Sequence, residues 1–256
     1  MQTVKINGEE NMKIHYIMPM AGRGSRFNQE GFDLPKPLLE IYGMPFFYWA
    51  TRSISKFIEL SSINFVVLQE HVDNFSIDKV IKNFFPEARI IELPKVTEGA
   101  VITSMKGIEE INDELPIIFN DCDHLFKSEK FNNFCNLKFD STIDGILLTF
   151  EANEPKYSFI EKDNNGNIIR TVEKRVVSDE AICGCYYFKN KKIFLKSAEE
   201  YLINCNYNEY FMSGVYNVMI ENNKKIKSMK TDFHIPFGVP EEYIIAKESK
   251  KYKELL

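Results

Sequence analysis

The sequence has little excess charge and no long hydrophobic run. Its 32 Lys and Arg residues against 37 Asp and Glu residues give a formal net charge of −5, so no overall positive charge attracts nucleic acid or an anionic membrane surface. No segment approaches the roughly 18 consecutive apolar residues of a membrane-spanning helix. Residues 1–13 also lack the apolar core of a secretory signal. We therefore expect a cytoplasmic protein whose partners include neither nucleic acid nor a membrane.

Cysteine is scarce and lacks the spacing of a metal or redox motif. The five cysteines form no Cys-x-x-Cys pair, and an odd number in a chain of 256 residues is atypical of a disulfide framework. Cys183 and Cys185 flank Gly184 within an apolar segment, a pattern that predicts buried thiols in a strand. These features indicate a reduced environment.

Apolar residues are plentiful and periodic. They make up 44% of the chain, enough for a large core. Compact apolar segments alternate with segments of helical spacing along the first half, which predicts a mostly parallel sheet covered by helices on both faces. The expected strands are 13–20, 63–68, 88–93, 116–120 and 145–150, and the expected helices are 46–58, 72–85 and 99–111.

The second half has a different pattern. Two strands around the turn Asp163–Gly166 predict an antiparallel hairpin. We therefore predict the α/β fold class, with one domain over residues 1–256, a small antiparallel insertion that completes a cleft, and a polar N-terminal extension over residues 1–11. The other elements expected are a strand at 181–188, helices near 191–204 and 209–222, a strand near 225–231 and a helix from about residue 240.

A cationic loop with two glycines follows the first predicted strand. In the segment AGRGSRF, Gly22 and Gly24 permit close approach of the backbone to a ligand and leave N–H groups that can point at phosphate oxygens. Arg23, Arg26 and Lys36 add three cations within fourteen residues. Ligands of open α/β sheets bind beyond the carboxyl ends of the strands, where this loop is expected. The loop therefore predicts a phosphate site.

Lys36 stands between Pro35 and Pro37, which restrict the backbone on both sides of it. The alternative interpretation is an ordinary solvated loop. The two glycines alone would favour that alternative, but the glycines together with the two arginines and the Pro-Lys-Pro segment favour a phosphate site. Two other phosphate motifs do not fit. The sequence has no Gly-Lys-Ser/Thr of a Walker loop, and Phe27 occupies the place of the third glycine of a dinucleotide fingerprint.

Acidic residues follow a second apolar strand in the segment FNDCDHLF. Asp121 and Asp123 are expected at the ligand edge of the sheet, where two carboxylates together with substrate phosphates can hold Mg²⁺. The alternative is that both aspartates only cap the following segment. His124 is either a third ligand or a hydrogen-bonding neighbour.

Taken in order, these motifs resemble those of the nucleotidyltransferases that activate sugar phosphates. The matching segments are AGRGSRF, PKPLLEI, TEGA, the Asp-x-Asp-His strand end, VEK, CGCYYF and FGVPEEY. The resemblance implies a Rossmann-like nucleotidyltransferase fold, with a loop that cradles the nucleotide, two cations on its phosphates, a base pocket, a metal site and an acceptor site. The residues implied are Ala21, Gly22, Arg23, Gly24 and Ser25 for the cradle, Arg26 and Lys36 for catalysis, Glu98, Gly99 and Ala100 for the base, Asp121 and Asp123 for the metal, and Glu173, Lys174, Gly184 and Tyr186 for the acceptor.

One position departs from the family pattern. Many members of the family place a second metal-binding aspartate where this chain has Pro236. Asp232 or His234 is a candidate substitute, and the second ligand stays unassigned.

The resemblance implies that an acceptor phosphate attacks the α-phosphorus of a nucleoside triphosphate with Mg²⁺ as cofactor. The segments NDCDH and TEGAV are similar to cytidylyltransferases of bacterial surface-polysaccharide pathways, above all those that join CTP and phosphoglutamine in capsule phosphoramidate synthesis. The alternatives are a hexose-1-phosphate acceptor with UTP or dTTP, a metal-dependent glycosyltransferase that uses a nucleotide-sugar, and a nucleotide sensor without turnover. The aromatic run 46–49 is interpreted as helix packing or the surface of a homodimer, with a cofactor site as the less favoured alternative.

Overall fold

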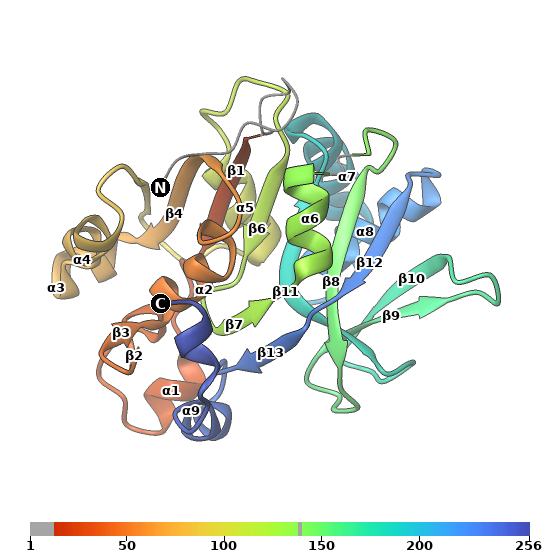
Figure 1. Ribbon diagram of the computed structural model, residues 1–256. Coiled ribbons are helices and arrows are strands. Elements are labelled where there is room, and N and C mark those ends of the chain that lie inside the picture. Colours follow the sequence, from red (N-terminus) through yellow and green to blue (C-terminus); the bar gives the residue numbers. More distant parts are fainter. Residues whose placement is uncertain (1–12, 138–139) are drawn as a thin grey trace.

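Figure 1 shows the computed structural model, which describes residues 13–137 and 140–256. The extension predicted for residues 1–11 lies outside the described residues. A mixed nine-stranded sheet forms the centre of the described part, in the order β10–β9–β11–β6–β1–β4–β5, with β8 paired to β11 and β12 paired to β8. Its strands are β1 (Ile14–Pro19), β4 (Leu60–Leu68), β5 (Arg89–Leu93), β6 (Ile117–Asn120), β8 (Gly145–Glu151), β9 (Ser158–Lys162), β10 (Ile168–Glu173), β11 (Glu180–Phe188) and β12 (Ile226–Lys230).

The sheet has a parallel part and an antiparallel part. Strands β6, β1, β4 and β5 run parallel to one another, whereas β11 runs antiparallel to β6, β8 and β9. The hairpin predicted in the second half is β9 paired with β10. The fold class is therefore confirmed as a mostly parallel mixed sheet with smaller antiparallel pieces. Two short pairs lie outside it, β2 (Glu40–Ile41) with β3 (Met44–Pro45) and β7 (His124–Lys127) with β13 (Phe233–Pro236).

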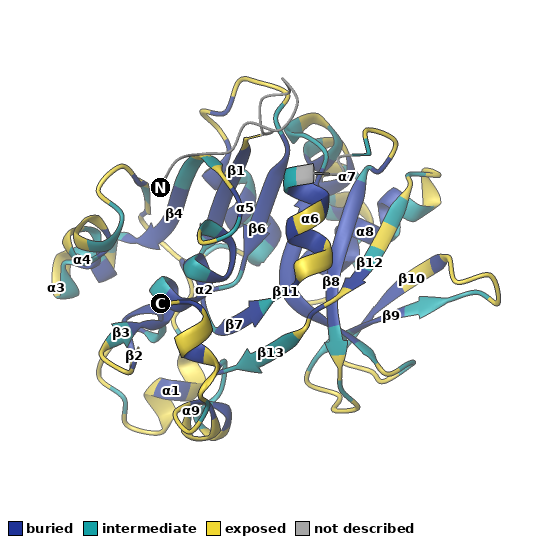
Figure 2. Ribbon diagram, viewed as in Figure 1, coloured by how far each residue is buried: buried dark blue, intermediate teal, exposed yellow. Residues whose placement is uncertain are grey.

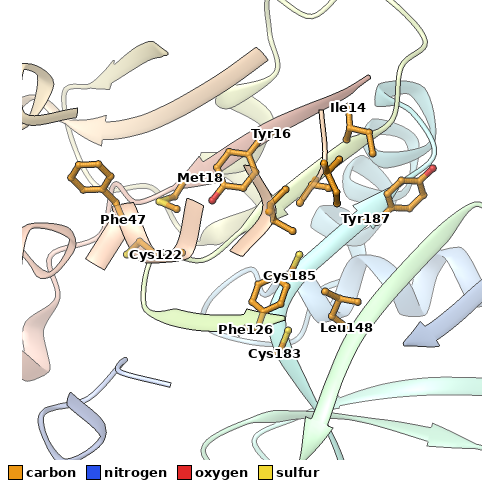
Figure 3. Packing of buried hydrophobic residues seen from close by; sticks show 14 of the residues in the cluster. Ile14, Tyr16, Met18, Phe47, Cys122, Phe126, Leu148, Cys183, Cys185 and Tyr187 are labelled. Atoms are coloured by element: carbon orange, nitrogen blue, oxygen red, sulfur yellow. The ribbon is translucent and has the colours of Figure 1, made fainter. Parts of the chain in front are cut away.

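Helices cover both faces of the sheet. Buried residues of α2, α4 and α6 pack on one face, and those of α5, α7 and α8 pack on the other. Strand β1 shows why, because successive side chains of a strand point to opposite faces. Tyr16 and Met18 belong to the first cluster, part of which Figure 3 shows, and Ile17 belongs to the second. The helices are α1 (Ser25–Gln29), α2 (Phe46–Ser55), α3 (Gln69–Phe75), α4 (Ile77–Phe84), α5 (Ala100–Gly107), α6 (Glu129–Leu137), α7 (Lys191–Asn204), α8 (Met212–Glu221) and α9 (Pro240–Ala246).

The aromatic run at the start of α2 lies in the core. Phe46, Phe47 and Trp49 are fully buried within the chain, and the Trp49 Nε1 donates to the Ile41 carbonyl at 2.8 Å. The interpretation as helix packing is therefore confirmed, and a dimer surface at these three side chains is wrong. Figure 2 shows the same contrast at larger scale, with β1 and β6 buried and the outer sides of α6 and α9 exposed.

Two details of the sequence prediction are wrong. The single helix expected over 72–85 is two helices, α3 and α4, separated by Ser76 with φ of 50°. This break starts a new helix that buries Ile77 and Ile81 completely. The pair β7–β13 is absent from the prediction because four-residue strands have too few residues to show a period, and the helix α6 is also absent from it. No helix in the described ranges is long and apolar enough to span a membrane.

Candidate active site

The glycine loop and the lysine between two prolines lie against each other. The loop leaves the carboxyl end of β1, and a Cβ placed on Gly24 would lie 2.9 Å from the Cβ of Lys36. Lys36 begins a short 3₁₀ turn over Lys36–Leu38, in which Pro37 and Leu38 are buried. The prolines therefore hold the backbone while the ammonium extends beyond it.

Lys36 reaches the acidic end of β6. Its Nζ donates to Asp123 Oδ2 at 2.8 Å, and each side chain is 24% exposed. Burial is the largest single effect on the pKa of the Lys36 ammonium and lowers it, but the charge and hydrogen bond of Asp123, together with the other acidic groups nearby, raise the pKa overall. Burial is the largest single effect on the pKa of Asp123 and raises it, but the charge and hydrogen bond of Lys36, together with His124 and a backbone hydrogen bond, hold the pKa below the ordinary value. The two predicted motifs, 87 residues apart, therefore meet as a charged pair.

Asp121 is the second carboxylate of this site. Burial, followed by the nearby charge of Asp123, raises the pKa of Asp121 to about 7. The raised pKa means that burial and the neighbouring carboxylates disfavour the ionised form of Asp121 more than the Lys36 charge favours it. A further cation would stabilise the ionised form, and oxygen donors are the ligands that Mg²⁺ prefers. The donor set of Asp121 and Asp123 therefore fits a hard divalent ion.

Two glycines leave space beside the carboxylates of Asp121 and Asp123. Gly184 in β11 has φ of 81°, and a Cβ there would lie 2.7 Å from Asp121 Oδ2. The Asp121 N–H donates to the Gly184 carbonyl at 2.9 Å. A Cβ on Gly238 would lie 2.6 Å from Asp123 Oδ2. Any side chain at either position would occupy the space beside a carboxylate.

Two adjoining cavities meet at this pair of motifs. One, of about 230 Å³, runs along the glycine loop, and the other, of about 270 Å³, runs toward β9, β11 and α9. Lys36, Asp121 and Asp123 line both cavities. Gly22 and Gly24 line only the smaller one. The predicted residues that line the larger cavity in addition are Arg26, Ala100, Glu173, Gly184 and Tyr186.

Other predicted residues do not line these cavities. Ala21 is buried in the core, and Arg23 is exposed with its Nε 4.0 Å from Glu70. Lys174 has its ammonium 4.6 Å from the ring centre of Phe211. The other predicted site residues that line neither cavity are Ser25, Glu98 and Gly99. Their predicted roles stay predictions.

Gly99 nevertheless fixes the position of its segment. A Cβ there would lie 2.5 Å from the backbone nitrogen of Tyr210, and Tyr210 N–H donates to the Glu98 carbonyl at 3.1 Å. The Val101 N–H in turn donates to the Tyr210 carbonyl at 3.3 Å. The segment 97–100 is therefore joined to the loop before α8. Phe211 at the end of this loop and Met212 and Ser213 at the start of α8 line the larger cavity.

The sequence analysis does not identify several residues that line the larger cavity. Glu242, which is 8% exposed, accepts from Lys156 Nζ at 2.8 Å, from the Tyr157 hydroxyl at 2.7 Å and from the Gly238 N–H at 3.0 Å. The FGVPEEY segment that carries Glu242 was one of the matching motifs. Its neighbour Glu241 has the same side chain, so the motif did not say which of the two faces inward. Lys156 and Tyr157 carry no signal in the sequence.

Glu173 is the acidic residue on the acceptor wall. Its Oε2 accepts from the Ser213 hydroxyl at 2.9 Å and from the Ser158 hydroxyl. Among the described residues it forms no ion pair, so its charge is available to a ligand in the cavity. The wall is therefore acidic, with Lys156 and Arg26 as its cations.

His124 and His234 lie at the back of the same cavity. His124 Nε2 is 3.0 Å from Asn120 Oδ1, and its Nδ1 is 3.3 Å from His234 Nε2. Burial lowers the pKa of His124 to about 4 and that of His234 far below its ordinary value. Of the two candidates for the missing ligand, His234 lines the cavity, while Asp232 accepts from the Glu129 N–H at 2.9 Å.

Comparisons with known proteins agree with this fold. A family model described as nucleotidyl transferase matches residues 17–247. The bifunctional protein GlmU of Lactobacillus helveticus is 26% identical over 163 residues, which are 60% of this chain and 35% of that protein. The chain thus covers about a third of the length of this curated relative.

Solved structures of two other proteins have the same architecture. A nucleoside-diphosphate-sugar pyrophosphorylase from Vibrio cholerae matches 91% of this chain and 100% of its own, with a TM-score of 0.79 and 24% identity. An inositol-1-phosphate CTP transferase from T. maritima matches 97% of this chain and 96% of its own, with a TM-score of 0.73 and 17% identity. The fold is therefore that of these enzymes, and the chain belongs to the nucleotidyl transferase family.

Proposed function

We propose that this member of the nucleotidyl transferase family transfers a nucleoside monophosphate from a nucleoside triphosphate to a phosphorylated small molecule and releases pyrophosphate. The observation that carries the proposal is the contact of 2.8 Å between Lys36 Nζ and Asp123 Oδ2, at the junction of two cavities. The cavity along the glycine loop takes the nucleotide phosphates, and the larger one takes the acceptor.

The reaction needs no protein nucleophile, because the acceptor phosphate is already an anion. One of its oxygens attacks the α-phosphorus in line, and the bond from that phosphorus to the bridging oxygen of the β-phosphate breaks. The electron pair leaves with pyrophosphate. Lys36 and Arg26 neutralise the phosphate charges and orient the groups, which are the main contributions that a protein makes to such a transfer. Asp121 and Asp123 would hold Mg²⁺, which supplies positive charge to the phosphate oxygens when bound.

CTP and phosphoglutamine are the substrates that we favour, in the synthesis of a surface-polysaccharide precursor. The solved relative from T. maritima is an inositol-1-phosphate CTP transferase, which supports CTP. Glu173 lines the acceptor cavity without an ion pair among the described residues, and a carboxylate of this kind suits the ammonium of an amino-acid phosphate. Arg26 lines the same cavity and suits the phosphate or the carboxylate of such an acceptor, and Lys156, which pairs with Glu154 and Glu242, is a second cation on its wall.

A hexose-1-phosphate with UTP or dTTP is the second candidate. It is favoured by the similarity to the Vibrio cholerae nucleoside-diphosphate-sugar pyrophosphorylase. Ser158, Ser213 and Glu173 could bind sugar hydroxyls as well as an ammonium. A glycosyltransferase would release a nucleoside diphosphate from a nucleotide-sugar, and the cations of the glycine loop suit a triphosphate better than this less charged donor.

A panel assay of pyrophosphate release tests the proposal. CTP, UTP, dTTP, ATP and GTP are each combined with phosphoglutamine, phosphocholine and hexose-1-phosphates in the presence of Mg²⁺. We expect pyrophosphate that requires both substrates, with the highest kcat/KM for CTP and phosphoglutamine. A higher value for a hexose-1-phosphate would select the second candidate. Tight nucleotide binding without pyrophosphate from any pair would contradict the enzymatic proposal altogether.

A further inference from the structure

Three side chains of the ligand types that transition metals prefer meet on the wall of the larger cavity. His124 comes from β7, His234 from β13 and Cys183 from β11, and their ligand atoms all lie within 4.8 Å of one another. His124 is 2% and Cys183 4% exposed, and all three line the cavity. Imidazole nitrogens and thiolates suit Zn²⁺, whereas the nearby aspartates offer only the oxygen donors of Mg²⁺.

The hydrogen bonds around Asn120 fix the orientation of His124. The Asn120 Nδ2 donates to the Ala50 carbonyl and to the Tyr16 hydroxyl, each at 3.1 Å. A carbonyl can only accept, so the amide nitrogen must face Ala50 and the amide oxygen must face His124. His124 Nε2 therefore carries the hydrogen and donates to Asn120 Oδ1. Its Nδ1 keeps a lone pair that points toward His234.

This arrangement is that of a metal-binding histidine held by a second group. Such histidines donate their other ring N–H to a carboxylate, carbonyl or water, which sets the tautomer and the ring direction. The separation of His124 Nδ1 and His234 Nε2 is 3.3 Å. Two imidazole nitrogens on one tetrahedral zinc ion, each about 2.0–2.1 Å from it, are about 3.3–3.4 Å apart. The two rings thus already have the spacing that one ion requires.

The His234 ring has one hydrogen-bonding contact among the described residues, from its Nε2 to His124 Nδ1. Its Nδ1 is buried and has no hydrogen-bond partner among the described residues. Its ring also stacks near Phe150, with the ring centres 4.0 Å apart. The ring is thus held by packing and by its single contact with His124. An ion bound between the two ring nitrogens would replace this contact and join His234 to β7 and β11 through the metal, with the ring hydrogen of His234 on Nδ1.

We propose that His124, His234 and Cys183 form a site for a borderline-soft divalent ion such as Zn²⁺, whose fourth position faces the larger cavity. When the ion binds, the thiol proton of Cys183 is released to solvent and the sulfur coordinates as thiolate. The fourth ligand is water or an oxygen of a molecule in the cavity. The site uses other side chains than the adjoining carboxylates of Asp121 and Asp123, and it does not rest on the proposed transfer reaction.

Metal binding to the intact protein tests this site directly. The protein is treated with a chelator and dialysed against Zn²⁺ and, separately, Co²⁺ in the presence of excess Mg²⁺. We expect one bound Zn²⁺ per chain, and a Co²⁺ form with the visible bands of tetrahedral cobalt and a thiolate charge-transfer band. Cys183→Ala should remove the charge-transfer band and weaken Zn²⁺ binding at least tenfold.

Matched variants separate this site from its neighbours. Cys185→Ala removes a buried thiol from the same strand two residues away and should leave both readouts unchanged. Asp121→Asn removes a hard ligand and should also leave the thiolate band intact. His234→Ala gives an independent test if Cys183→Ala does not fold. Cobalt spectra without a thiolate band, or equal Zn²⁺ binding by wild type and both cluster variants, would overturn the proposal and leave a hydrogen-bonded histidine pair.

Discussion

At each end of strand β1 an aspartate contacts a nitrogen-bearing side chain, and the two pairs have different surroundings. At the carboxyl end, Lys36 and Asp123 lie 2.8 Å apart and are both mostly buried. At the amino end, His15 Nε2 lies 2.9 Å from Asp113 Oδ1, and the Asp113 side chain is 51% exposed. The first pair lies beside a second, half-buried carboxylate, Asp121, whereas the His15 ring contacts Asp113 and Ser62 among the described residues.

Cavity size does not distinguish the two ends. The hollow beside Asp113 has about 370 Å³, more than the 270 Å³ of the candidate site. Its walls carry exposed side chains, including Asn112, Asp113 and Glu114. The carboxyl end differs in its two neighbouring carboxylates. Burial and the charge of Asp123 raise the pKa of Asp121, and glycines leave space beside both side chains. A ligand must supply what is missing, as expected at this edge of an α/β sheet.

The largest contrast between the two ends should come from Lys36→Ala. Removing one preorganised charge partner of a transition state costs about 3–4 kcal/mol, so kcat should fall roughly 10²–10³-fold. Pyrophosphate release measures the effect, and circular dichroism checks that the variant is folded. The control is Lys79→Ala, an exposed lysine in α4, which should keep full turnover. Near-normal turnover of Lys36→Ala would remove Lys36 from the mechanism.

A pair of glycine variants separates backbone strain from the crowding of Asp121. Gly184 and Gly166 have φ of 81° and 82°, so an alanine costs about 1–3 kcal/mol at either position. Only at Gly184 would the new Cβ collide with Asp121, because Gly166 has nothing within 4 Å. Urea unfolding should show a loss of stability in both variants, and turnover should fall only in Gly184→Ala. Equal turnover of the two would show that the space beside Asp121 has no role.

Glu242→Gln tests the part of the site that the sequence did not reveal. The change weakens a charged hydrogen bond to Lys156, whose side chain is 34% exposed, so the cost should be about 1 kcal/mol. We expect the KM for the acceptor to rise roughly fivefold with little change in the KM for the nucleotide. Glu241→Gln, one residue earlier in the first turn of α9, is the matched control. The same change of KM in both variants would argue against a role for Glu242 in the acceptor cavity.

The smallest effect is expected at the amino end. The partial burial of Asp113 acts to raise its pKa, but hydrogen bonds from His15 and the Leu115 N–H lower it overall. Because the folded pKa lies below the ordinary value of about 3.9, the stabilisation is present above about pH 4 and is lost as the pH falls further. Asp113→Asn should therefore lower the free energy of unfolding by less than about 1 kcal/mol at pH 6, without loss of turnover. A loss of turnover would contradict the contrast between the two ends.

The sequence predicted the strand-end motifs better than the acceptor wall. Lys36 and Asp123 stand out because prolines and an apolar strand constrain their neighbours in the sequence, and parallel strands bring their carboxyl ends to one edge. Glu242, Lys156 and Tyr157 come from segments far apart in the sequence, so only tertiary packing shows that they meet. The break between α3 and α4 at Ser76 also depends on tertiary packing, because Ile77 and Ile81 after it are buried in the core.

Transfer of an ¹⁸O label tests the central claim most directly. The acceptor phosphate is labelled with ¹⁸O and incubated with unlabelled CTP, Mg²⁺ and the wild-type protein, and the products are resolved by mass spectrometry. We predict that the label appears in the nucleotidylated acceptor, including the new bridge to the α-phosphorus, and that pyrophosphate is unlabelled. Label in pyrophosphate, or release of a nucleoside diphosphate in place of pyrophosphate, would contradict attack by the acceptor at the α-phosphorus.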